Sequence, residues 1–328
     1  MNILLTAINA KYIHSNLAVY SLRACAGEYR DAVELAEYTI NNQKDYILEE
    51  LYKRKPDVLC FSCYIWNIDY VTDIAREYKK LCPSVPIWVG GPEVSYEVEA
   101  FLRENPYIDG VMIGEGEDTF RELCGYYAHK RKLSDIAGIA FRKNSTGNST
   151  SVNNIGGNKA GEIVFTSPRP IKNMSEIPFC YDTLDDFSNR IIYYESSRGC
   201  PFSCSYCLSS VDKTLRFRDT EIVKRELKFF IDQKVPQIKF VDRTFNCKRD
   251  HTLGIWRYLV EHDNGITNFH FEVSADIFDE EELELIGKMR PGLIQLEIGV
   301  QSTNPDTIKE IHRHMDLVKL KQAVDRVY

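Results

Sequence analysis

Short apolar runs alternate with amphipathic stretches along residues 1–142 of the chain. Runs of this kind, rich in Val, Ile, Leu and aromatic residues, are typical of buried β-strands. Apolar positions spaced three and four apart predict helices between them, for example over residues 71–81 and 98–104. Strands that alternate with helices indicate a doubly wound α/β domain, with a parallel sheet covered by helices on both faces. The predicted strands comprise residues 2–8, 57–64, 86–91 and 109–114.

The next segment, residues 143–190, lacks this alternation. Its first part, residues 143–162, is poor in apolar residues and rich in Gly, Ser, Asn and Thr, which predicts a hairpin tip or a flexible linker. Pro168, Pro170 and Pro178 then favour an extended connection. We therefore expect residues 143–190 to connect two domains.

Strand and helix patterns resume over residues 191–328. Four strand–helix units in series predict a (β/α) barrel, and because no further strand pattern follows, we expect a partial one. In such barrels the chemistry lies at the carboxyl ends of the strands. The predicted strands lie within residues 191–197, 237–242, 269–276 and 293–301, and helices are predicted at 220–233, 250–262, 280–289 and near the end.

Two of these strands have one apolar and one polar face. His270, Glu272 and Ser274 alternate with apolar residues on one strand, and Gln295 and Glu297 do so on the next. Because side chains alternate between the faces of a strand, the polar set is expected to point into the barrel. A polar interior favours a ligand-filled centre. The alternative is that these side chains satisfy one another or lie at a sheet edge.

The composition of the chain limits the classes of function that the protein can have. The 328 residues are 44% hydrophobic and 27% charged, which is ordinary for about two globular domains. The net charge of −7 argues against broad nucleic-acid binding. The sequence has neither a signal peptide pattern nor a run of about 18 apolar residues that would span a membrane. With ten cysteines, we expect a cytoplasmic protein in which clustered cysteines bind metal.

One cluster of cysteines stands out. Cys200, Cys204 and Cys207 lie in "RGCPFSCSYC", directly after the first strand of the predicted barrel. Thiolates suit zinc or an iron–sulfur cluster, yet both usually take four ligands. No second CxxC or His pair is near, and Cys180 and Cys247, the candidates for a fourth ligand, do not lie in a paired motif. The pattern favours a cluster with one open iron over a zinc site or three idle cysteines.

This loop resembles the CxxxCxxC loop of radical S-adenosylmethionine (SAM) enzymes, including the aromatic residue Tyr206 before the last cysteine. In that family three thiolates hold a 4Fe–4S cluster, and its open iron binds the amino and carboxylate groups of SAM. Reduction by a flavodoxin- or ferredoxin-type electron donor then yields a 5′-deoxyadenosyl radical. The resemblance covers residues 191–328 and implies four of six β/α units of a radical SAM barrel.

The same resemblance implies SAM-binding residues at the carboxyl ends of the strands. The aromatic residue would pack near the adenine, and the "FVDRTFN" turn would approach the amino group. The third and fourth strands would approach the aminocarboxylate, ribose and adenine. Hydrogen bonding within the barrel is the alternative for each residue. The implied SAM contacts are Tyr206, Asp242, Arg243, Glu272, Ser274 and Gln301.

Beside such a barrel, residues 1–142 resemble the Rossmann-like cobalamin-binding domain of one branch of the family. "SCY" follows one strand and "GEGEDTFREL" comes two strands later. A Gly-Gly pair follows the strand between them, where the resemblance implies that a bulky ligand approaches the backbone closely. The Asp-x-His-x-x-Gly motif that supplies a lower cobalt ligand is absent. Lys11 stands where that His would fall, and His14 follows three residues later. The implied cobalamin contacts are Asn9, Lys11, His14, Ser62, Tyr64, Gly90, Gly91, Gly114 and Glu115.

The combined resemblance implies a cobalamin-dependent radical SAM enzyme, and above all a methyltransferase acting on an unactivated carbon. Radical SAM cyclisation, rearrangement or methylthiolation is an alternative. A non-catalytic metal-binding regulatory protein is another. The expected substrate is a small molecule or a peptide, without bulk nucleic acid or membrane. Beyond the three cysteines, no catalytic residue follows from the sequence.

Overall fold

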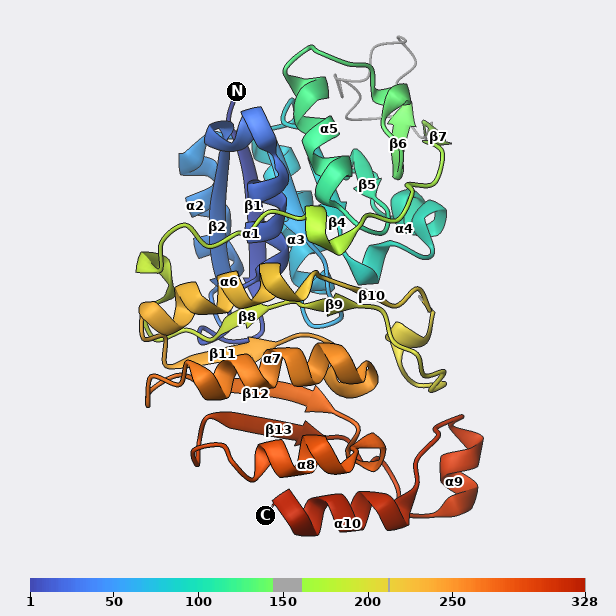
Figure 1. Cartoon of the computed structure of the whole chain (residues 1–328). Coiled ribbons are helices and arrows are strands. Elements are labelled where there is room, and N and C mark those ends of the chain that lie inside the picture. The colour runs from blue at the N-terminus through green and yellow to red at the C-terminus, as the bar shows by residue number, and fades with distance from the viewer. Residues whose placement is uncertain (144–160, 212, 328) are drawn as a thin grey trace. The chain divides into compact units, whose positions relative to one another are not determined.

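The computed structural model describes residues 1–143, 161–211 and 213–327 (Figure 1). The chain divides into two compact units. The first consists of Met1–Ile171 and Ile177–Arg190. The second consists of Lys172–Glu176 and Ile191–Tyr328.

The first unit contains a seven-stranded sheet in the order β2-β1-β3-β4-β5-β6-β7. Neighbouring strands from β2 to β5 pair in parallel, while β5–β6 and β6–β7 pair antiparallel. Its strands are β1 Ile3–Asn9, β2 Val33–Thr39, β3 Val58–Ser62, β4 Ile87–Gly90, β5 Gly110–Met112, β6 Ile139–Lys143 and β7 Glu162–Phe165. Its helices are α1 Leu17–Cys25, α2 Lys44–Arg54, α3 Ile68–Leu81, α4 Val98–Glu104 and α5 Glu117–Tyr127.

This architecture confirms the predicted doubly wound domain, and the four predicted strands appear as β1, β3, β4 and β5. The pattern missed β2, whose sequence "VELAEYT" mixes apolar and charged residues. β2 ends the sheet, so it pairs with one neighbour only and has half-buried positions. An edge strand needs no continuous apolar run, and its sequence therefore resembles a loop or a helix.

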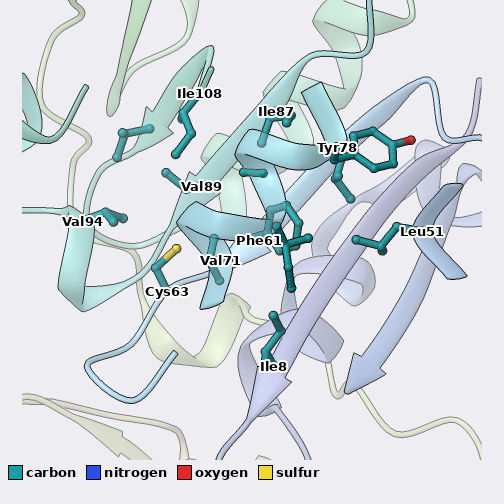
Figure 2. Close-up of a cluster of buried hydrophobic side chains, with 14 of the residues drawn as sticks. Ile8, Leu51, Phe61, Cys63, Val71, Tyr78, Ile87, Val89, Val94 and Ile108 are labelled. Atoms are coloured by element: carbon teal, nitrogen blue, oxygen red, sulfur yellow. The ribbon is translucent and has the colours of Figure 1, made fainter. Parts of the chain in front are cut away.

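A cluster of buried side chains joins the sheet to its helices (Figure 2). Phe61 and Val89 come from the central strands, and Val71 and Tyr78 come from one face of α3. Their spacing on α3 is the 3.6-residue period that places side chains on one helix face. Burial of each such large side chain contributes about 1.5–3 kcal/mol, so this layer holds the strand ends in place.

The described part of residues 143–190 is divided between the two units, whereas a single connection between two domains was expected. Residues 162–165 form β7, which pairs with β6 and extends the first sheet. Ile177–Arg190 belongs to the first unit, where Arg190 forms an ion pair with Glu37 of β2. Lys172–Glu176 belongs to the second unit. The prediction of a hairpin tip or linker falls on residues 144–160, which lie outside the described residues.

The second unit contains a four-stranded parallel sheet in the order β13-β12-β11-β8, as expected for successive β/α units. These strands are β8 Ile192–Tyr194, β11 Gln237–Phe240, β12 Asn268–Val273 and β13 Ile294–Ile298. The helices are α6 Thr220–Asp232, α7 Arg249–Glu261, α8 Glu280–Ile286, α9 Pro305–Glu310 and α10 Leu317–Val327. Two short strands, β9 Ser197–Arg198 and β10 Arg216–Phe217, form an antiparallel pair.

Among the described residues, no helix has both the length and the apolar character that a membrane crossing requires.

Candidate functional site

A loop with three cysteines follows the first strand of the second unit. β8 ends at Tyr194, and the pairing of β9 with β10 holds the chain directly before the loop. Gly199 then turns the chain with φ +93°, and a Cβ there would lie 2.6 Å from the carbonyl oxygen of Thr214. No side chain fits that position unless the neighbouring backbone moves. The glycine therefore sets the direction in which the chain enters Cys200.

The three thiols share one loop, but they are not gathered into a metal site. Cys200 and Cys204 are buried, Cys207 is half-buried, and all three are free. Within the parts of the chain that the structure describes, no three His, Cys, Asp or Glu side chains converge as metal ligands. Cys200, Cys204 and Cys207 therefore stay predicted ligands. Three soft thiols on one loop are the donor type that an iron–sulfur cluster takes.

The two candidates for a fourth ligand lie in different units of the chain. Cys180 belongs to the first unit, and Cys247 to the second. Burial raises the pKa of the Cys247 thiol to about 11, and electrostatic interaction with Cys200 adds to the shift. Cys247 is thus near the cysteine loop but is held in its protonated form. Because the thiolate is the ligating form, this residue is poorly suited to close the site.

Tyr206 links the cysteine loop to the far strand of the sheet. Its side chain is 51% exposed. Its hydroxyl accepts a hydrogen bond of 3.0 Å from Nη1 of Arg313, and Nη2 of Arg313 donates to the carbonyl of Gly299 after β13. An exposed ring beside the loop suits the predicted contact with adenine, which stays a prediction.

Asp242, after β11, occupies a different place from the one expected. It is fully buried and accepts hydrogen bonds from Ser196 N at 3.0 Å, Ser196 Oγ at 2.7 Å and Ser197 Oγ at 2.5 Å. Nε2 of His251 lies 2.9 Å from Ser196 Oγ. Burial raises the pKa of the Asp242 carboxyl to about 7, although these hydrogen bonds lower it. The carboxylate faces its own chain rather than an open ligand site.

The other predicted SAM contacts lie at the carboxyl ends of β11, β12 and β13. Arg243 and Gln301 are exposed, and Gln301 has φ +63°. Ser274 is buried and donates a hydrogen bond of 2.7 Å to Asp276. Glu272 is half-buried. A ligand can therefore reach Arg243, Gln301 and Glu272 more easily than it can reach Ser274.

The polar strand face carries a chain of ion pairs. Nζ of Lys239 lies 2.9 Å from Glu297 and 3.7 Å from Glu272. Nε2 of His270 lies 3.1 Å from the same Glu297 carboxylate. Burial raises the pKa of Glu272, although the positive charge of Lys239 lowers it. The strand alternation is as expected, and Lys239 pairs with both glutamates, as in the alternative to a ligand-filled centre.

In the first unit, large apolar side chains are exposed at the carboxyl edge of the sheet. They come from the loops that follow β1, β3 and β4, whose parallel strands all end at this edge. The sequence pattern did not predict them, although the two adjacent pairs "YI" and "IW" carry the signal. Contiguous apolar patches mark ligand or interaction surfaces, whereas single exposed apolar side chains are common. The exposed side chains at this edge are Tyr12, Ile13, Ile65, Trp66 and Tyr96.

The turn after β3 presents two stacked rings. Tyr64 and Trp66 lie with ring centroids 4.4 Å apart and planes 6° apart. Asn67, the residue after Trp66, is fully buried and donates hydrogen bonds of 2.9 Å to the carbonyls of Ile8 and Ser62. These hydrogen bonds fix the turn to β1 and β3. A flat aromatic face held in place at a sheet edge suits a large planar ligand such as a corrin ring.

Two predicted cobalamin contacts, Asn9 and Ser62, have hydrogen-bond partners within the protein. Asn9 is buried and donates to the carbonyl of His14 at 3.1 Å and to Glu37 at 2.9 Å. Ser62 is also buried, and its hydroxyl accepts a hydrogen bond of 3.3 Å from Asn16. Asn9 and Ser62 therefore face the protein interior. Buried polar groups need such partners because an unpaired one destabilises the fold.

Lys11 and His14 lie in the loop after β1. Lys11 is exposed, and its carbonyl accepts a hydrogen bond of 3.2 Å from the backbone N–H of His14. His14 is half-buried and engaged in an interaction within the structure. Neither side chain is fully buried, and both remain predicted contacts of cobalamin.

The glycines at this edge have different roles. Gly91 has φ +122°, and a Cβ there would lie 2.4 Å from the carbonyl oxygen of Cys63. The close approach that requires Gly91 is thus to the neighbouring strand, whereas close approach to a ligand was expected. A Cβ on Gly90 would make only ordinary contacts. Gly114 has φ +74° and open space around it, so it and Glu115 remain candidates for a ligand.

Two family models match the chain and follow the two units closely. The B12 binding domain matches residues 3–124, and the radical SAM superfamily matches residues 194–328. The chain belongs to the radical SAM proteins that carry a B12-binding domain.

Curated relatives include both methyltransferases and a cyclase. An uncharacterized methyltransferase of Pyrococcus horikoshii is 30% identical over 213 residues, covering 62% of this chain and 43% of the relative. The cobalamin-dependent radical SAM methyltransferase TokK of Streptomyces tokunonensis is 29% identical over 238 residues, covering 68% and 31%. An anaerobic magnesium-protoporphyrin IX monomethyl ester cyclase of Rubrivivax gelatinosus is 23% identical over 316 residues, covering 91% and 53%.

A solved structure has the same fold. The cobalamin-dependent SAM radical enzyme OxsB, with aqua-cobalamin and SAM bound, matches with a TM-score of 0.75 at 18% identity. The match covers 99% of this chain and 47% of OxsB. The chain also spans less than half the length of the Pyrococcus and Streptomyces relatives.

We expect Gly91→Ala to destabilise the ligand-free first unit. The added Cβ would meet the Cys63 carbonyl and force a left-handed backbone on an L-residue, which costs roughly 1–3 kcal/mol. Gly90→Ala is the matched control and should change the free energy of unfolding by much less. Thermal unfolding without cobalamin measures both. Equal stability of the two variants would contradict this role for Gly91.

We expect His251 to make the second unit less stable in acid. Burial, followed by the positive charge of Lys248, lowers the pKa of His251 to about 4. As the pH falls from about 6.5 to 4, the unfolded chain binds a proton that folded His251 does not, so the free energy of unfolding decreases by up to about 3 kcal/mol. Urea unfolding across this range should show the decrease in wild type relative to His251→Gln. Parallel pH profiles would contradict it.

Proposed function

We propose that the protein containing this chain is a cobalamin-dependent radical SAM methyltransferase that acts on an unactivated carbon. The observation that carries the proposal is the pairing, in one chain, of a three-thiol loop after β8 with a stacked aromatic edge in a B12-binding domain. The methyltransferases among the relatives support the reaction type.

The residues have distinct roles in this function. When bound, the iron–sulfur cluster and SAM supply radical chemistry, and cobalamin supplies a methyl carrier. Cys200, Cys204 and Cys207 would hold the cluster and leave one iron for SAM. Tyr206 offers a ring face beside that loop. Tyr64 and Trp66 offer a flat apolar surface that would exclude water from one side of a corrin.

The remaining features of the proposal concern the surroundings of the enzyme. All ten cysteines are free thiols, which suits a reducing cytoplasm. We propose a small-molecule or peptide substrate, because the net charge of −7 disfavours bulk nucleic acid. A flavodoxin- or ferredoxin-type protein would supply the electrons. The cyclase among the relatives keeps radical chemistry without methyl transfer as the second candidate.

Anaerobic reconstitution with iron and sulfide tests the cluster. We expect the wild-type chain to bind iron and sulfide and to cleave SAM to 5′-deoxyadenosine, and Cys200→Ala, Cys204→Ala and Cys207→Ala each to lose this activity. Cys247→Ala is the matched control and should keep it, because the fourth iron is left for SAM. Loss of the cluster in Cys247→Ala would indicate a closed site. Metal without sulfide would indicate a zinc protein and contradict the proposal.

Cobalamin titration tests the aromatic edge. Trp66→Ala removes one face of the stacked pair and should weaken cobalamin binding about tenfold, since a buried aromatic contact contributes roughly 1–2 kcal/mol. Tyr52→Ala is the control, because Tyr52 is an equally exposed aromatic residue on α2, away from this edge. Absorbance after ultrafiltration measures the bound corrinoid. Equal binding by both variants would contradict the site.

Methyl transfer itself is tested with SAM that carries a labelled methyl group. Label on the cobalamin and then on a carbon of the substrate supports the methyltransferase. Production of 5′-deoxyadenosine without label on any product would favour the cyclase-type reaction instead.

A further inference from the structure

The cysteine loop begins at a buried carboxylate. Asp242 has no exposed surface, and its two oxygens accept three hydrogen bonds from Ser196 and Ser197. Both serines are also buried. The backbone N–H of Val241 donates to Tyr194 O at 2.9 Å, which continues the pairing of β11 with β8 up to this point.

The segment with the two serines is held from its other side as well. The carbonyl of Ser196 accepts a hydrogen bond of 2.8 Å from the backbone N–H of Arg218. His251 is buried, lies 2.9 Å from Ser196 Oγ, and its ring centroid is 4.9 Å from that of Phe217. With Asp242 ionised, the Ser196 hydroxyl donates to the carboxylate and accepts from Nε2–H of His251. The side-chain oxygens of Asp242, Ser196 and Ser197 therefore each have a partner inside the protein.

The distance along the chain from this cluster to the first cysteine is short. Arg198 and Gly199 are the only residues between Ser197 and Cys200, and the turn at Gly199 admits no side chain. Thr244, two residues after Asp242, places its hydroxyl 3.7 Å from the Cys200 sulfur. One segment after β11 thus holds both the start of the loop and its first thiol.

We propose that Asp242 is a positioning residue for the cysteine loop. It fixes Ser196 and Ser197 and thereby sets where Cys200 presents its sulfur. This role replaces the expected contact between Asp242 and SAM, because the amino group of a ligand reaches this carboxylate only if the serines leave it. The inference rests on the proposed function for the identity of the bound group, but the clamp itself exists in the metal-free chain.

The first test uses the metal-free chain, so it does not depend on cluster assembly or methyl transfer. Cys200 is only 8% exposed, and its alkylation therefore requires local opening of the loop. Asp242→Ala should increase the alkylation rate of Cys200 roughly tenfold or more, as followed by mass spectrometry, because it removes buried hydrogen bonds to a charged group. Glu282→Gln, which changes a buried carboxylate on α8, is the control and should leave the rate unchanged.

A milder series covers the case in which Asp242→Ala does not fold. Ser197→Ala removes one hydrogen bond and should give a smaller increase in the alkylation rate. Ser197→Thr keeps the hydroxyl and should restore the wild-type rate. A merely general loss of stability would not be rescued in this way. Unchanged alkylation in both Asp242→Ala and Ser197→Ala would overturn the proposal.

The second test separates positioning from ligand binding. After reconstitution, the Asp242 and Ser197→Ala variants should show a changed electron paramagnetic resonance spectrum of the reduced cluster without SAM, and unchanged SAM affinity per cluster. Wild-type spectra with weakened SAM affinity would overturn the proposal and assign Asp242 to SAM. If no variant and no wild-type chain forms a cluster, the proposed function fails while the alkylation result stands.

Discussion

Parallel strands joined through helices bring all their carboxyl ends to one edge of a sheet, and both units of this chain depend on that constraint. In the first unit it collects the loops after β1, β3 and β4, which carry the exposed aromatic side chains. In the second it brings the cysteine loop after β8 to the same edge as the turns after β11, β12 and β13. Residues far apart in the chain become neighbours because their strands are paired in register.

Each edge is then held by a buried polar cluster. Glu37 accepts hydrogen bonds from Asn9, Asn16 and Tyr20 in the first unit, and Asp242 accepts them from two serines in the second. Such networks rigidify a site only when every member is satisfied. The polar residues of these clusters are therefore occupied within the protein. The residues left for ligands are the exposed ones beside them.

This division explains why several predicted ligand contacts already have partners within the protein. The pattern around Asn9, Ser62 and Asp242 was that of residues at strand ends, where ligands bind, but all three side chains point inward. Gly91 was expected to make room for a ligand, yet it makes room for the backbone of Cys63. Conversely, Trp66 was not singled out, because one aromatic residue in a loop has no periodicity to mark it. Burial depends on neighbours from other strands, which no local pattern contains.

The sequence by itself determined the strand and helix order, the two-domain organisation and the cysteine loop, because apolar periodicity and the spacing of soft ligands are local properties. It also predicted the alternating faces of β12 and β13, which follow from the two-residue period of a strand. Tertiary structure alone decided the pairing of β6 with β7, the partners of Lys239 and the burial of Asp242. These depend on contacts between segments distant in sequence, such as the 46 residues that separate Ser196 from Asp242.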